Sequence, residues 1–188
     1  MVCMEIEKIK QWLKTNLDKE RYEHSLGTAE CAAELAKKFK LNEEKAYLAG
    51  LIHDCAKCLP KNECNEILCN LELCEGELEN CKTHHAPIGE YKAIEIFGIN
   101  DTEILSAIRW HTLGKKDMTV FEKIIFLADK IEKRTRPREY TDPITKILEE
   151  ENGLNKALLI CYKNTIKSLV DRNLKICTLT IEIYNSLL

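Results

Sequence analysis

The sequence contains little glycine and proline, the residues that most often interrupt helices and form tight turns. Its 188 residues include 7 glycines and 4 prolines, about 6% of the chain against an average usage of about 12%. It also lacks a glycine-rich phosphate-binding loop, an internal repeat and a persuasive alternation of apolar and polar residues, so no strand is predicted. With 45% hydrophobic residues, the composition favours an all-α globular fold.

Long apolar runs and an excess of basic residues are missing as well. No stretch approaches the roughly 18 apolar residues of a membrane span, and no basic segment followed by an apolar one opens the chain. We therefore expect a cytoplasmic protein without a membrane partner. The net charge of −3 argues against a general nucleic-acid binder. The oligomeric state is left open, with a homodimer as one option.

The chain contains ten cysteines and five histidines, the two residue types that most often bind transition metals. Six of the cysteines lie between Cys55 and Cys81, but only Cys55 and Cys58 form the close pair that is typical of zinc sites. Thiols stay reduced in the cytoplasm, and a free cysteine packs as a small hydrophobic residue. We interpret the cysteines mainly as packing residues, with metal binding or redox sensing as the alternative.

The hydrophobic periodicity predicts helices along most of the chain. The expected helical segments are 5–17, 20–39, 46–56, one that begins near Pro60, 87–98, one that is capped by Asp101 and ends at Gly114, and 119–131 with a Thr119/Glu122 capping box. Residues 75–84 are predicted as a loop and 132–142 as a charged connector. Residues 143–188 predict two or three helices, broken at Asn152-Gly153 and at Asn173.

Ionisable residues interrupt the apolar patterns at four places. They are His24, the adjacent pair His53 and Asp54, the group His84, His85 and His111, and Asp129. Aspartate is rarely buried without a partner, because an unpaired buried charge is costly. Two aspartates in two apolar helices therefore point to a common cation, with imidazoles completing its ligand shell. Histidine and aspartate without thiolate suit iron, manganese, cobalt, nickel or zinc.

Each of these positions has a simpler interpretation when it is taken alone. His24 could be a surface residue or a hydrogen-bonded core residue, and Asp129 could pair with Lys130. The pair His53-Asp54 is harder to explain in this way, because the surrounding helix is apolar on every face. Spacing alone does not place these residues in one site, since they lie on separate predicted helices.

The order His24, His53-Asp54, Asp129 resembles the signature of the HD-domain metal-dependent phosphohydrolases. The sequence that flanks these residues is similar to that of one branch of the family, the YqeK-type symmetrical bis(5′-nucleosyl)-tetraphosphatases. The segments that carry this similarity are 21–26, 48–57, 85–89, 104–112 and 122–129. The resemblance implies a single HD domain over 1–188, a helical bundle with a motif core at about 20–135 and C-terminal helices (143–188) packed on it.

The resemblance also implies a reaction and a set of site residues. The reaction is cleavage of diadenosine tetraphosphate into two ADP molecules, with ADP or GDP as a product-like ligand. The metal, commonly iron, would be held by His24, His53, Asp54 and Asp129. Catalytic roles in orienting water, binding phosphate or protonating the leaving oxygen are expected for Asp54, His85, His111 and Lys57. The expected nucleotide-binding residues are His24, His53, His85, His111, Thr112, Asp129, Arg134, Arg136, Arg172 and Cys177.

Two segments depart from the family pattern. The family usually has Pro-Asn-Arg after the last metal aspartate, whereas this chain has 133–137 Lys-Arg-Thr-Arg-Pro, so either Arg134 or Arg136 could contact phosphate. The family often has His-Pro near the C-terminus, whereas this chain has Cys177 and Thr178, which leaves the base preference open. The basic residues between 130 and 138 suit phosphate neutralisation, and a solvated connector would have the same composition.

Two other functions stay open at this stage. The chain could be another HD-family nucleotide phosphohydrolase, such as a nucleotidase or a deoxynucleotide triphosphohydrolase. It could also be a metal-containing nucleotide-binding sensor with weak turnover. His84 has no counterpart in the family pattern and is expected on the surface.

Overall fold

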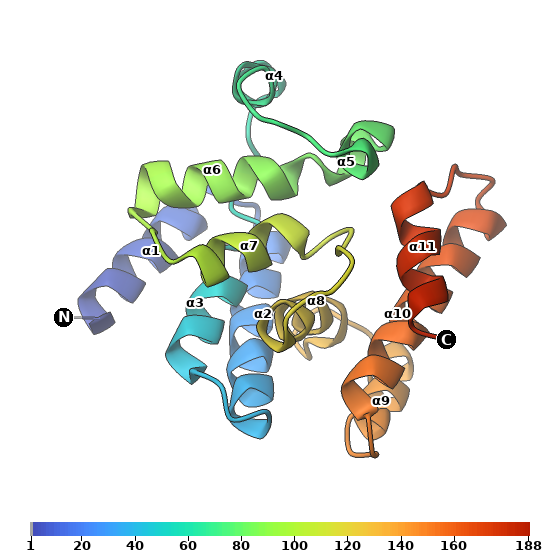
Figure 1. Cartoon of the computed structure of the whole chain (residues 1–188). Coiled ribbons are helices and arrows are strands. Elements are labelled where there is room, and N and C mark those ends of the chain that lie inside the picture. Colours follow the sequence, from blue (N-terminus) through green and yellow to red (C-terminus); the bar gives the residue numbers. More distant parts are fainter. Residues whose placement is uncertain (1) are drawn as a thin grey trace.

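The computed structural model describes residues 2–188, with side chains described from Ile6 onward. Within this range the structure is helical and contains no strand, which confirms the all-α prediction (Figure 1). None of the described helices is both long enough and apolar enough to cross a membrane. The elements are α1 (Val2–Asn16), α2 (Lys19–Lys38), α3 (Glu43–Ile52), α4 (Lys61–Leu68), α5 (Glu75–Glu79), the 3₁₀ turn η1 (Cys81–Thr83), α6 (His85–Phe97), α7 (Thr102–Trp110), α8 (Val120–Ile131), α9 (Arg138–Ile147), α10 (Gly153–Asp171) and α11 (Thr178–Ser186).

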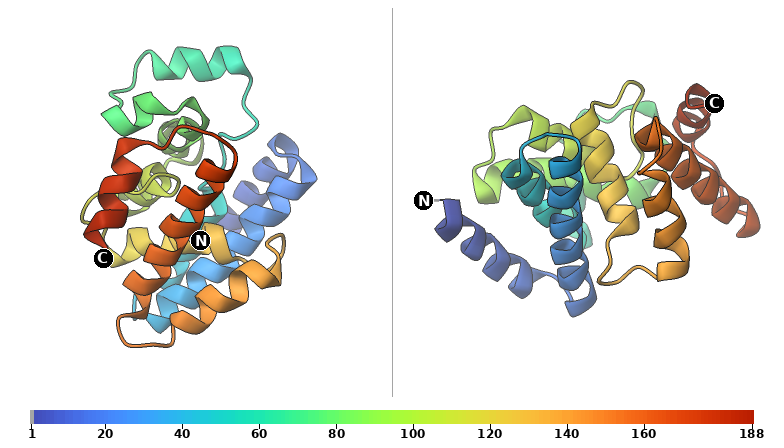
Figure 2. Two further views of the ribbon diagram at one scale, coloured as in Figure 1. Left: turned by 90° about the vertical axis from the view of Figure 1, so that its right-hand side faces the viewer. Right: turned by 90° about the horizontal axis from the view of Figure 1, so that it is seen from below.

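The main core forms where α2, α3, α7 and α8 pack together (Figure 1). Helix α8 is apolar on nearly every side, and Ile124, Ile125 and Leu127 have no exposed surface. Figure 2 shows that α1 flanks this core on one side and that α9, α10 and α11 flank it on the other. Helix α4 lies outside the main core, on a small separate cluster of Ala56, Ile67 and Ile88.

Helices α2 and α3 approach each other closely because α3 carries Gly50 at their crossing. A Cβ atom at this position would lie 2.8 Å from the carbonyl oxygen of Thr28 and 2.9 Å from the Cα atom of Ala29. Both of these are backbone atoms of α2, so neither can rotate away. Gly50 therefore sets the spacing between the two helices.

We predict that Gly50→Ala lowers the free energy of unfolding by about 1–3 kcal/mol, because the extra methyl group overpacks the crossing. Thermal unfolding followed by circular dichroism measures this change, at roughly 2–4 °C in Tm per kcal/mol for a chain of this size. Gly98→Asn is the matched control. Gly98 has a φ of +64° with no neighbour near its Cβ position, and asparagine tolerates that conformation. An unchanged Tm in Gly50→Ala would contradict the steric argument.

Two predicted helix starts are confirmed by their capping contacts, whereas the helix predicted over 46–56 runs from Glu43 to Ile52, so His53 and Asp54 follow its end. The Thr119 hydroxyl accepts a hydrogen bond from the Glu122 amide at 3.2 Å, and the Glu122 carboxylate accepts one from the Thr119 amide at 2.8 Å. The Asp101 side chain caps α7 through the Glu103 amide at 3.0 Å. The expected breaks at Asn152 and Asn173 fall on residues with φ of +56° and +53°.

Two predictions of irregular structure are wrong. Residues 75–84 contain α5 and η1, which are held by long-range contacts. The Glu77 carboxylate caps the Cys74 amide at 2.8 Å and accepts hydrogen bonds from Arg109 at 3.0 and 2.9 Å. The segment 132–142 is a connector only as far as Pro137, since α9 begins at Arg138.

The cysteines whose side chains are described divide into buried, half-buried and exposed groups, with Cys64 and Cys74 half-buried, while the side chain of Cys3 lies outside the described residues. Cys31, Cys55, Cys161 and Cys177 are buried, as a packing role requires. Cys58, Cys69 and Cys81 are exposed, so packing does not explain them. Among the described side chains, no cysteine belongs to a group of residues that could hold a metal ion.

Candidate metal centre and active-site cavity

His53 and Asp54 lie at the C-terminal end of α3, at the middle of the molecule. The His53 side chain is 0% exposed and Asp54 is 4% exposed. Burial lowers the pKa of His53 to about 4, so its imidazole is neutral near pH 7. Burial alone would raise the pKa of the Asp54 carboxyl, but the neighbouring His53, His111 and His85 hold it well below its usual value. The pair therefore consists of a neutral imidazole beside a carboxylate.

Three imidazoles of the site are oriented in the same way. Each places its Nδ1 within hydrogen-bond distance of the backbone carbonyl three residues earlier, which puts the proton on Nδ1 and leaves the lone pair on Nε2. The Nδ1-to-oxygen distances are 2.6 Å for His53 and Gly50, 2.9 Å for His85 and Lys82, and 2.6 Å for His111 and Ile108. This backbone anchoring is the arrangement that metal-binding histidines commonly show.

The Nε2 lone pairs point toward carboxylate oxygens. The Nε2 atoms of His111 and His85 lie 3.3 and 3.4 Å from Asp54 Oδ1. The Nε2 of His53 lies 3.8 Å from Asp129 Oδ1 and 3.9 Å from Asp54 Oδ2. Because a lone pair and a carboxylate repel each other, this convergence calls for a positive charge between them.

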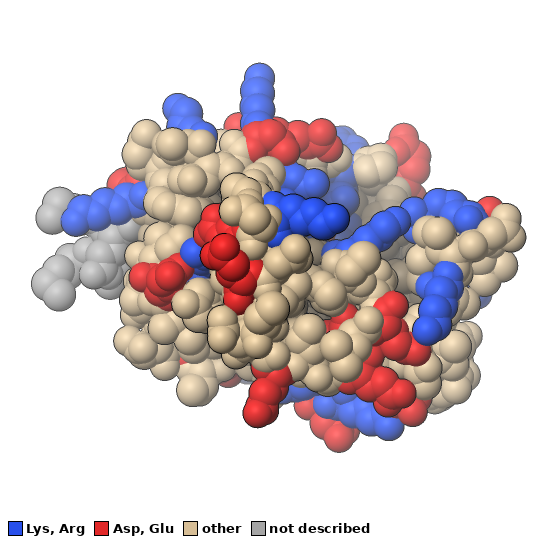
Figure 3. Space-filling view, turned by 90° about the horizontal axis from the view of Figure 1, so that it is seen from above, with Lys and Arg blue, Asp and Glu red and all other residues tan. Residues whose placement is uncertain are grey.

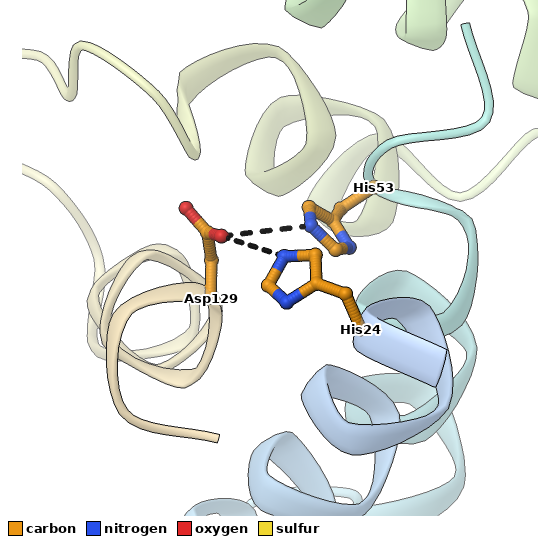
Figure 4. A group of neighbouring side chains, drawn as sticks. All are labelled: His24, His53 and Asp129. Carbon is orange, nitrogen blue, oxygen red and sulfur yellow. Dashed lines mark hydrogen bonds and ion pairs between the residues drawn. The ribbon is translucent and has the colours of Figure 1, made fainter. Parts of the chain in front are cut away.

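The residues present fit a metal ion. His53 Nε2 and Asp54 Oδ1 are buried and have no hydrogen-bond partner, which is costly unless a cation satisfies them. Two groups of side chains have ligand atoms close enough to share one ion, and His53 belongs to both of them (Figure 4 shows the first). These groups are His24, His53 and Asp129, and His53, Asp54 and His111. The donors are imidazole and carboxylate without thiolate, which suits a transition metal.

His24 is held between two carboxylates. Its Nε2 lies 2.9 Å from Asp129 Oδ1, and its Nδ1 lies 3.1 Å from Glu132 Oε1. Burial alone would lower the pKa of His24, but the hydrogen bonds to Asp129 and Glu132 raise it to about 9. With Nε2 free to bind a cation, the Nδ1–H group of His24 can still donate its hydrogen bond to Glu132, and this contact fixes the orientation of the ring.

Glu132 is a site residue that the sequence analysis missed. Its side chain is fully buried and accepts hydrogen bonds from the backbone amides of Arg134 at 2.6 Å and Thr135 at 3.1 Å. Burial would raise its pKa, but the contact with His24 and these hydrogen bonds lower the pKa to about 2. The available signal was a carboxylate directly after the apolar run of α8, three residues from Asp129.

The metal-binding candidates open onto a cavity of about 340 Å³. The cavity is lined by carboxylates and by the cations Arg21, Lys57, Lys130 and Arg136, each of which lies within 4 Å of Asp54 or Asp129. The Lys57 ammonium donates to His85 Nε2 at 2.9 Å, and burial lowers the pKa of Lys57. The cavity therefore combines a cation-binding floor with positive charge suited to anionic groups. Of the predicted residues, it brings together His24, Asp54, Lys57, His85, His111, Thr112, Asp129 and Arg136, with His53 directly behind them.

The structure separates the two arginines between which the sequence could not choose. Arg136 lines the cavity, and its guanidinium donates to Asp129 Oδ1 at 3.0 Å. Arg134 faces outward and pairs with Glu23 at 2.7 Å and with Glu30 at 2.6 Å. Arg134 is therefore not brought to the cavity.

The remaining predicted nucleotide contacts lie outside this cavity. Cys177 lines a smaller cavity of about 120 Å³, which shares Thr112 with the main one. Arg172 lines a third cavity beside Tyr140 and Ser168. The side chain of Cys177 contacts α5, because its thiol donates a hydrogen bond to the Gly76 carbonyl oxygen at 3.6 Å.

The arrangement is that of an HD domain, and the family model for the HD domain matches residues 21–134. The chain therefore belongs to the HD-domain family. Among curated proteins, it is 37% identical over 181 residues to the symmetrical bis(5′-nucleosyl)-tetraphosphatase of Halalkalibacterium halodurans, covering 95% of this chain and 94% of that protein. It is also 37% identical over 174 residues to the protein of the same name from Bacillus subtilis, covering 92% of each.

A solved structure confirms the fold at higher identity. The crystal structure of a predicted HD superfamily hydrolase involved in NAD metabolism from Clostridium acetobutylicum superposes with a TM-score of 0.88 at 40% sequence identity. The match covers 97% of this chain and 96% of that one. The C-terminal helices α9 to α11 are therefore part of the shared architecture, along with the segment that the family model matches.

Proposed function

We propose that this protein is a metal-dependent phosphohydrolase that cleaves diadenosine tetraphosphate symmetrically into two ADP molecules. The observation that carries the proposal is the convergence of imidazole lone pairs and ionised carboxylates at the floor of a cation-lined cavity. The full-length similarity to symmetrical bis(5′-nucleosyl)-tetraphosphatases supports the choice of substrate. We propose His24, His53, Asp54 and Asp129 as the ligands and iron as the metal, with manganese, cobalt, nickel or zinc as the other candidates.

A metal ion bound there supplies a Lewis acid that lowers the pKa of a coordinated water to about 7. The side chains of the chain supply the remaining functions. Asp54 lies within 3.4 Å of both His85 and His111 and can orient the attacking water through its free oxygen lone pairs. Arg136, Lys130 and Lys57 offset the charge that develops on the phosphate oxygens.

The protonation states of His85 and Lys57 suggest different roles for the two residues. Burial lowers the pKa of His85 to about 3, so this imidazole is neutral and presents an acceptor. The ammonium of Lys57 donates to that acceptor, and we propose it as the proton donor to the leaving oxygen. His111 and Thr112, whose Nε2 and Oγ1 atoms lie 2.9 Å apart, complete this wall of the cavity.

The test is product analysis with purified protein, first depleted of metal by a chelator and then reconstituted with Fe²⁺, Mn²⁺, Co²⁺, Ni²⁺ or Zn²⁺ separately. We expect no turnover of diadenosine tetraphosphate without metal and ADP as the only nucleotide product with it. Release of phosphate or triphosphate from mononucleotides in its place would favour another HD phosphohydrolase. Tight ADP or GDP binding without any turnover would favour a sensor.

A further inference from the structure

A second cavity lies directly beside the active-site cavity. It has a volume of about 600 Å³ and is bounded by α4, η1 and the first turn of α6. We call it the α4 groove. The two cavities share the side chains of Lys57 and His85, which form a hydrogen bond with each other, so these two residues lie at the boundary between the cavities.

The α4 groove combines positive charge with an apolar floor. Lys61 and Lys82 line it together with Lys57, and no acidic residue lines it among the residues that the structure describes. Lys61 and Lys82 are exposed, and neither forms an ion pair within the described part of the chain. Figure 3 views the molecule from the side on which α4 lies and shows basic and acidic side chains intermixed on that face.

Three apolar residues, Ala56, Leu68 and Ile88, line the groove, and we call them its floor. Ala56 and Ile88 are 2% and 1% exposed, so the half-buried Leu68 offers most of the apolar surface that a ligand can touch. A pocket with an apolar surface and a few convergent polar groups is typical of sites for small organic ligands. Lysines at its edge select for an anionic ligand, so the chemistry fits a flat base with attached phosphates.

The active-site cavity offers less space than the α4 groove. Its 340 Å³ lies near the lower end of the roughly 300–1,000 Å³ that enclose one drug-sized ligand. A symmetrical cut occurs at the centre of the substrate, so two equal halves extend from the reacting phosphate in two directions. The α4 groove adjoins the active-site cavity and offers space for one of these halves.

We infer that the α4 groove binds the second nucleoside diphosphate half of the substrate, with Lys61 and Lys82 on its phosphates and its base on the floor of Ala56, Leu68 and Ile88. This inference rests on the proposed function. The groove makes a second ADP-binding site on each chain, and His85 and Lys57 stand at the point where the two halves join.

The first test is the stoichiometry of ADP binding, measured by calorimetry on the metal-loaded protein. We expect two ADP molecules per wild-type chain and one per chain of the double variant Lys61→Ala/Lys82→Ala. The control is Lys146→Ala/Lys163→Ala, which removes the same charge at two exposed lysines of α9 and α10, outside both cavities, and is expected to bind two. One ADP per wild-type chain would overturn the inference.

The second test is steady-state kinetics with diadenosine tetraphosphate. Contacts made equally in the ground state and the transition state affect KM more than kcat. We therefore expect the Lys61/Lys82 variant to raise KM about tenfold with kcat within twofold of wild type. Unchanged KM, or an equal fall in kcat, would contradict binding of substrate in the groove. If wild-type protein forms no ADP from the dinucleotide, the proposed function fails, whereas two bound ADP per chain would still support the groove as a site.

Discussion

Replacing His53 with alanine is expected to remove both the bound metal and the hydrolytic activity. Two groups of side chains in the described structure can share an ion, and His53 is the one residue common to both. Its ring is held through Nδ1, and its Nε2 has no hydrogen-bond partner. Lewis-acid activation contributes several kcal/mol to the transition state, and each 1.36 kcal/mol is tenfold in rate. We therefore expect kcat/KM to fall by about 10³ or more.

Metal content by elemental analysis, together with the turnover of diadenosine tetraphosphate, measures this effect. Ile52→Val is the matched control, because Ile52 is the fully buried neighbour of His53 and offers no ligand atom. This control costs about 0.5–1.5 kcal/mol of stability and is expected to keep both metal and activity. A His53→Ala protein with full metal content and wild-type turnover would contradict the assigned site.

Arg136→Ala is expected to lower kcat/KM by about 10²–10³, the usual cost of removing one group that stabilises developing negative charge. Arg136 is held at the cavity by two contacts with Asp129, from its Nε to the backbone oxygen and from its Nη2 to Oδ1, each at 3.0 Å. The metal content is expected to stay close to that of wild type. This outcome separates a phosphate-binding role from a metal-binding one.

Arg134→Ala is the natural comparison for Arg136→Ala. It removes the same side chain two residues away, where the guanidinium pairs with exposed Glu23 and Glu30 outside the cavity. Exposed ion pairs contribute little to stability, so kcat/KM is expected to stay within about threefold of wild type. A larger loss in Arg134→Ala than in Arg136→Ala would show that the arginine roles are reversed.

The sequence predicted the members of the site better than it predicted how they meet. The pair His53-Asp54 was recognisable because ionisable side chains in an apolar segment need a partner. That His24 and Asp129 lie beside this pair, where all four could share a cation, depends on how the helices pack, and spacing along one helix carries no such information. The choice between Arg134 and Arg136 depends on the turn after α8, where Glu132 accepts the Arg134 and Thr135 amides.

The errors have a common physical origin in long-range polar contacts. Helix α5 has few apolar residues, so its periodicity gave no signal, yet Arg109 holds it through Glu77. Glu132 was overlooked because a carboxylate at the end of a helix usually faces solvent, whereas here it faces His24. Cys58, Cys69 and Cys81 were taken as packing residues because a free cysteine commonly packs as a small hydrophobic residue, but their side chains are exposed.

The separate cluster beneath α4 has a consequence for the dynamics of the molecule. Ala56, Ile67 and Ile88 support α4 without sharing the main core, so α4 can open as a local cooperative unit at a fraction of the global unfolding free energy. Such an opening would leave the packing of α2, α3 and α8 intact, together with the side chains they position. One wall of the molecule can thus exchange with solvent on its own timescale while the centre stays ordered.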